Sequence, residues 1–100
     1  MNSRVQIDQE RIAEFCRRWK IVEFAIFGSA LGEGFTPDSD VDVLVTFAKD
    51  AGWSLYDWID MIDELQELFG RNVDLVSRGG LRNPFRRHEI LSTREVVYAA

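Results

Sequence analysis

Apolar residues recur at two different spacings in the first half of the chain, and the change predicts one helix followed by two strands. Residues 8–20 carry apolar side chains every three to four positions, which is typical of an amphipathic helix. These positions are Ile12, Phe15, Cys16 and Trp19. The runs 21–27 and 41–47 are continuous, rich in β-branched and aromatic residues, and predict strands.

The second half of the chain repeats this alternation. Ser54, followed three residues later by Asp57, indicates a capping box that opens a long helix to about Phe69. Residues 72–77 predict a third strand. Asn83 and Pro84 suit the cap and first residue of a last helix ending near residue 91, and residues 95–99 predict a short final strand. The expected fold is a single α/β (α+β) domain over residues 1–100, with a small mixed sheet flanked by helices.

Composition narrows the class of protein. One hundred residues with 46% apolar content can build one small core. A single cysteine allows no internal disulfide, which is typical of a reducing compartment. No apolar segment has the length of a signal peptide core or a membrane span, so we expect a cytoplasmic protein that does not bind membranes.

Charge is unevenly distributed along the chain. Residues 33–67 hold ten acids against Lys49 alone, whereas residues 78–88 hold four arginines and no acid. The acidic balance, with a net charge of −5, argues against direct nucleic-acid binding. The basic segment suits a phosphate-bearing ligand or an acidic protein surface.

Carboxylates cluster where the second predicted strand begins, in the stretch PDSDVDVLV over residues 37–45. Because side chains alternate along a strand, Asp40 and Asp42 share one side, roughly 6.6 Å apart, while the valines between and after them point to the core. Asp74 is the only acid of the third predicted strand, and it joins them if that strand lies beside the second. Oxygen ligands of this kind favour Mg²⁺, with Mn²⁺ as an alternative.

Other interpretations of the same aspartates differ in how well their spacing fits. An EF-hand loop starting at Asp38 requires Gly and Glu where this chain has Val43 and Lys49. The Asp-x-Asp string also resembles the nucleophile motif of haloacid-dehalogenase-type phosphatases, but there the apolar strand precedes the aspartates. A purely structural explanation also stays open, in which Asp38 and Asp40 are turn residues and Asp42 lies on a solvent-exposed strand face.

The stretch FGSALGEG ends the first predicted strand in Gly28 and Ser29. Glycine allows a phosphate to approach the backbone, and a serine hydroxyl with nearby amides can hold its oxygens. The stretch is neither a Walker P-loop nor a Rossmann glycine motif, and alone it is weak evidence.

Gly28-Ser29, then ten residues, then Asp40-Val41-Asp42 resembles the signature of the polymerase-β-like nucleotidyltransferase superfamily, and the short chain resembles its minimal nucleotidyltransferases. The resemblance implies transfer of AMP from ATP, with Gly28 and Ser29 on the triphosphate. It implies two Mg²⁺ ions on Asp40, Asp42 and Asp74, with Asp74 helping to activate the nucleophile. It further implies an antitoxin role, in which a tyrosine of a HEPN-domain RNase toxin is the acceptor.

One departure from the family pattern leaves alternatives to this function. Relatives often carry arginine just after Gly-Ser, whereas this chain has Ala30 and Leu31. Cationic help to the phosphates is then absent or comes from residues 78–87. The alternatives are a catalytically weak module that neutralises the toxin by contact, and a transferase acting on a small molecule, which usually needs a second domain.

Overall fold

Four strands form one sheet in the described part of the chain, which is residues 7–28 and 40–100 of the computed structural model. The strands are β1 (Ile21–Phe27), β2 (Val41–Phe47), β3 (Val73–Ser77) and β4 (Glu95–Ala99). The helices are α1 (Gln9–Arg18), α2 (Leu55–Phe69) and α3 (Pro84–Thr93), with a 3₁₀ turn, η2 (Arg78–Gly80), after β3. The predicted alternation of elements is confirmed.

Helix ends form at the residues whose side chains can cap them. Ser54 and Asp57 make the predicted capping box on α2, with Ser54 N donating to Asp57 Oδ2 at 2.9 Å. Gly70 ends this helix in the left-handed region, at φ 69°. Asn83 accepts hydrogen bonds from two backbone amides of α3, as its position before Pro84 predicts.

Strand pairing makes the sheet mixed, as predicted. Its order is β3-β2-β1-β4. β1 runs antiparallel to both of its neighbours, whereas β2 and β3 run parallel. The connection from β2 to β3 passes through α2, the crossover that parallel neighbours require.

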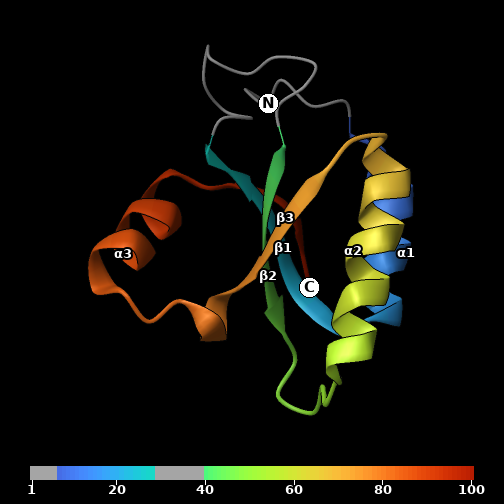
Figure 1. The fold of residues 1–100 in the computed structure, drawn as a ribbon, viewed down its shortest axis with the longest axis horizontal. Coiled ribbons are helices and arrows are strands. Elements are labelled where there is room, and N and C mark those ends of the chain that lie inside the picture. The colour runs from blue at the N-terminus through green and yellow to red at the C-terminus, as the bar shows by residue number, and fades with distance from the viewer. Residues whose placement is uncertain (1–6, 29–39) are drawn as a thin grey trace.

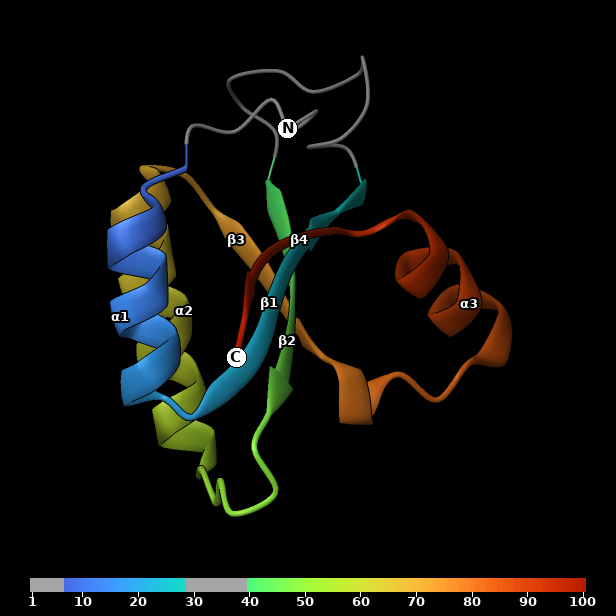
Figure 2. The same ribbon diagram turned by 180° about the vertical axis from the view of Figure 1, so that it is seen from behind.

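The first face of the sheet is covered by α1 and α2, which lie side by side (Figures 1 and 2). Their buried side chains interlock with alternate residues of the strands. The fully buried members include Ile12, Phe15, Cys16, Phe24, Val41, Val43, Val45, Met61 and Leu65. This is the larger of the two cores, and it confirms that the valines of β2 point inward.

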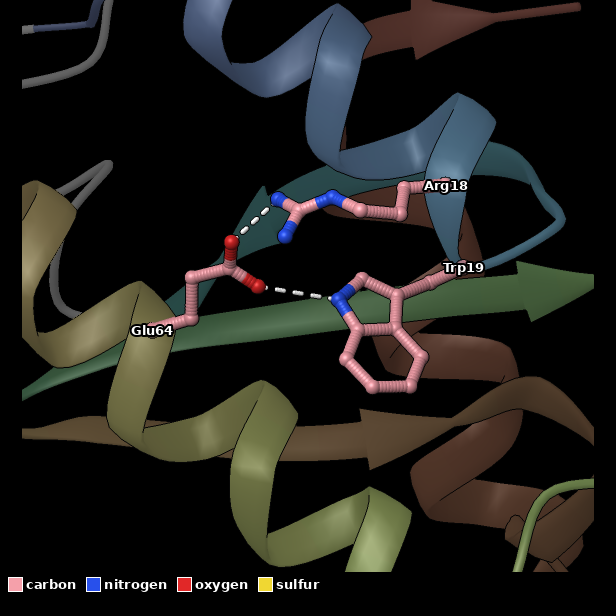
Figure 3. A network of polar contacts seen from close by, with 3 residues as sticks. All are labelled: Arg18, Trp19 and Glu64. Carbon is pink, nitrogen blue, oxygen red and sulfur yellow. Dashed lines mark hydrogen bonds and ion pairs between the residues drawn. The ribbon is translucent and has the colours of Figure 1, made fainter.

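A polar network joins α1 to α2 at the margin of this core (Figure 3). Arg18 Nη2 pairs with Glu64 Oε1, and Trp19 Nε1 donates to Glu64 Oε2 at 2.9 Å. Trp53 packs edge-on against Trp19 and donates from Nε1 to the Trp19 carbonyl at 2.8 Å. Through these two contacts, Trp53 connects the β2–α2 loop to the C-terminal end of α1.

The second face of the sheet carries α3 and a smaller core (Figures 1 and 2). Its buried members are Ala25, Phe27, Leu44, Leu81 and Ile90. Leu44 is fully buried here while its neighbours Val43 and Val45 are buried on the first face, so β2 is covered on both sides. None of the helices in the described residues has the length and apolar character needed to cross a membrane.

Candidate active site

Asp42 and Asp74 are side-by-side residues of the parallel strands β2 and β3. Paired residues on neighbouring strands project to the same face and are ~4.8 Å apart along the hydrogen-bonding direction. Asp42 is half-buried and Asp74 is exposed. The fold thus brings together two carboxylates that are 32 positions apart in sequence (74 − 42), on the face that carries α3.

Gly28 lies directly against the Asp42 carboxylate. Phe27, which precedes it, is paired with Asp42 across β1 and β2. A Cβ atom added to Gly28 would lie 2.3 Å from Asp42 Oδ2, and the residue has φ +72°, where L side chains are strained. Glycine is needed here for both reasons. The sequence motif pointed to a phosphate, and the contact with Asp42 is an additional role that sequence reasoning missed.

Asp40 is exposed and immediately precedes β2. The backbone there is anchored, because Val41 N donates to the Asn72 carbonyl at 2.9 Å and so ties the start of β2 to the start of β3. Ser29 falls outside the described residues, together with the rest of 29–39, so its predicted contact with phosphate stays a prediction.

Metal binding by these carboxylates fits their chemistry. Within residues 7–28 and 40–100, no three Asp, Glu, His or Cys side chains form a group that could hold a metal ion by themselves. Mg²⁺ is commonly held by one or two carboxylates together with substrate phosphates and water. Asp42 and Asp74 offer such a pair of hard oxygen ligands. The place of Asp40 in the set stays a prediction.

Two arginines of the basic segment lie at the other end of the same strands. Arg78 and Arg87 line a pocket of about 340 Å³ with Thr46 and Ser77. Thr46 is four residues beyond Asp42 on β2, or roughly 13 Å along the strand. These two side chains therefore form a separate basic site, and the expectation that they assist the triphosphate beside Asp42 has no support from their position.

The chain is similar in sequence and in structure to proteins that are already known. Residues 9–97 match the family described as Nucleotidyltransferase domain. The protein adenylyltransferase MntA of Thermococcus cleftensis is 35% identical over 85% of this chain and 81% of its own length. A solved structure assigned to the minimal nucleotidyltransferases is 32% identical, with a TM-score of 0.71, over 87% of this chain and 86% of that one.

More distant structures share the fold. A toxin–antitoxin complex with AMP-PNP contains a chain with a TM-score of 0.73 and 19% identity, over 94% of this chain and 75% of that one. A chain from the complex of a tri-AMPylated Shewanella oneidensis HEPN toxin with an MNT antitoxin has a TM-score of 0.65 and 19% identity. The match covers 92% of this chain and 70% of that one. These likenesses confirm the predicted polymerase-β-like fold, and the closer sequence matches confirm the predicted family.

Proposed function

This chain belongs to the family of nucleotidyltransferase domains, and we propose that it is an antitoxin that transfers AMP from ATP to a tyrosine of a HEPN-domain RNase toxin. The proposal of a protein acceptor is supported by MntA of T. cleftensis, a protein adenylyltransferase that is 35% identical. The proposal of a HEPN partner draws on the S. oneidensis complex, whose toxin carries AMP and is bound to an MNT antitoxin.

The observation that carries the proposal is the register of Asp42 with Asp74, together with the close packing of Gly28 on Asp42. Asp42 and Asp74 are neighbours on one face of the sheet. Their spacing suits a shared divalent cation. Gly28, the first residue of the Gly-Ser motif, lies directly against the Asp42 carboxylate.

The reaction joins the acceptor to the α-phosphate of ATP. The tyrosine hydroxyl oxygen forms a bond to the α-phosphorus, the bond from that phosphorus to the bridging oxygen of the β-phosphate breaks, and pyrophosphate leaves. Asp74, on the exposed side of the pair, accepts the hydroxyl proton, and Gly28 and Ser29 hold the triphosphate. Asp40, Asp42 and Asp74 are the residues that would hold Mg²⁺. When bound, Mg²⁺ would neutralise the phosphates and lower the pKa of the attacking hydroxyl.

Intact-mass spectrometry of the toxin tests this function. The toxin is co-expressed with the parent chain, with Asp42→Asn or with Asp60→Asn, a matched change at an exposed position of α2. We expect an added adenylyl group with the parent and Asp60→Asn, and a loss of more than about 100-fold with Asp42→Asn, since a direct metal ligand should matter more than its supporting contacts. An equal adduct with Asp42→Asn would contradict the proposal.

A contact-only antitoxin is the second candidate, favoured by Ala30 standing where relatives often have arginine. It predicts that Asp42→Asn neutralises the toxin as well as the parent does and that neither leaves an adduct. RNase activity measured in the same samples separates the two functions.

A further inference from the structure

Two open pockets meet at the end of edge strand β3, and they share Phe47 and Ser77. One is the basic pocket of Arg78 and Arg87, and the other is an aromatic pocket of about 340 Å³. Both lie at the opposite end of β2 and β3 from Asp42 and Asp74. They adjoin at Phe47 and Ser77, with the basic pocket on the α3 side of the sheet and the aromatic pocket on the α2 side, and we name the two together the β3-end surface.

The aromatic half of the β3-end surface is lined by Phe47, Trp53, Leu55 and Trp58. Leu55 is the first residue of α2 and is 73% exposed, although it is large and apolar. The rings of Phe47 and Trp58 pack against each other with centroids 6.3 Å apart, so the wall of the pocket is held in place. Rigid aromatic pockets of this kind are typical of the energetic centres of protein interfaces.

The basic half of the β3-end surface is positively charged, although the protein as a whole is acidic. The chain has a net charge of −5, yet the residues that line this pocket include Arg78 and Arg87 and no acid. Thr46 lines it too, and its Oγ1 is buried without a hydrogen-bond partner among the described residues. Unpaired buried hydroxyls are uncommon in native proteins. The charge of this pocket favours an anionic group.

The position of the β3-end surface relates it to the acid pair. β3 is the outermost strand of the described sheet, so one of its edges carries unpaired backbone groups that an extended segment of another protein can meet. Ser77 is three residues beyond Asp74, or roughly 10 Å along the strand. An extended segment that pairs with this edge from Ser77 therefore reaches the position of Asp74 about three residues further along.

We propose that the toxin partner docks on the β3-end surface, with a large apolar side chain in the aromatic pocket and an adjacent carboxylate between Arg78 and Arg87. This docking holds the acceptor tyrosine along β3 toward Asp74, and it rests on the proposed function for the identity of the partner and of the acceptor.

Affinity for the cognate HEPN-domain RNase, measured by titration calorimetry, tests the surface with two matched pairs of variants. Arg87→Glu changes a lining residue, and Arg86→Glu makes the same change one position away at an exposed residue outside both pockets. Leu55→Asp and Tyr56→Asp form the second pair, in which Tyr56 is 81% exposed but does not line the pocket. An acidic residue in the first turn of α2 is compatible with the helix.

We expect Arg87→Glu and Leu55→Asp to lower the affinity for the RNase by about tenfold or more. The control variants Arg86→Glu and Tyr56→Asp should lower it by less than about twofold. Equal affinities within each pair, or a parent that forms no complex, would overturn the β3-end surface. Intact mass of the toxin in the same samples reports on the transferase. A parent complex without an adduct would overturn the proposed transfer, while the docking surface would still be decided by the affinities.

Discussion

The two faces of the sheet differ in how completely they are closed. The first face is sealed by α1 and α2, with Phe15, Phe24 and Met61 at most 1% exposed. The second face has only a small core under α3, and it carries Asp42 and Asp74 at one end and the basic pocket of Arg78 and Arg87 at the other. The same strands supply both faces, because successive side chains point in opposite directions.

This difference indicates a division between stability and function. The first face removes most of the large apolar side chains from water, which is the dominant favourable contribution to folding. The second face is then free to expose charged residues and open pockets. Substitutions on the two faces should therefore affect different measurements.

The largest expected effect is the loss of a first-face aromatic. Phe15→Ala should destabilise the chain by about 3–5 kcal/mol, since it leaves a cavity between α1 and the sheet. Phe85→Ala on α3, where the side chain is 86% exposed, should change the free energy of unfolding by less than about 0.5 kcal/mol. Urea unfolding of both variants checks this. Similar losses in the two would contradict the contrast between the faces.

Gly28→Ala should affect both stability and the site. The left-handed backbone costs an L residue about 1–2 kcal/mol, and the new methyl group displaces the Asp42 carboxylate. We therefore also expect loss of the rise in melting temperature that Mg²⁺ with a non-hydrolysable ATP analogue gives the parent. Gly52→Ala is the control, because a Cβ there has no heavy atom within 4 Å. Retention of the full ligand-induced rise in Gly28→Ala would contradict the proposed site.

Cys16 should give the first face a pH dependence. Burial raises the pKa of its thiol from 9.0 to about 12, while Arg17 opposes the change. The unfolded chain releases this proton near pH 9.0 and the folded chain keeps it. Its contribution to stability is thus complete below pH 9.0 and is lost as pH rises toward about 12.

Urea unfolding over this alkaline range measures the slope. The parent should lose roughly 1 kcal/mol per pH unit more than Cys16→Ala, in which no thiol titrates. Equal slopes in the two proteins would mean that the thiol ionises as readily in the folded chain as in the unfolded one.

The smallest effect is expected from an ion pair outside both cores. Lys20 Nζ lies 3.0 Å from Asp50 Oδ2, and its hydrogen bond and charge lower the pKa of this exposed carboxyl. The contribution is present above the ordinary value of 3.8 and is lost as pH falls below it. Melting temperatures of the parent and Asp50→Asn should differ little at neutral pH, and that difference should vanish in acid or at high salt. A persistent difference in acid would point to another role for Asp50.

Local signals in the sequence accounted for most of the secondary structure. The capping residues Ser54, Asn83 and Gly70 act within a few positions of themselves, so they mark the ends of α2 and α3 without knowledge of the rest of the chain. The boundary errors were small. The first helix, α1, covers Gln9–Arg18 rather than residues 8–20, α3 ends at Thr93 rather than near residue 91, and β3 begins at Val73 rather than at residue 72. Helix ends fray and their last turn is often irregular, so a local pattern predicts the capping residue better than the last residue of an element.

The sequence by itself determined that acids stand at the start of two apolar strands and that a Gly-Ser motif precedes them. Only the tertiary structure decided that β2 and β3 are parallel neighbours with Asp42 opposite Asp74, and that Gly28 packs on Asp42. It also placed Arg78 and Arg87 at the far end of those strands. The physical reason is range: caps and periodicity act over a few residues, whereas strand order and register arise from burying both faces of the sheet at once.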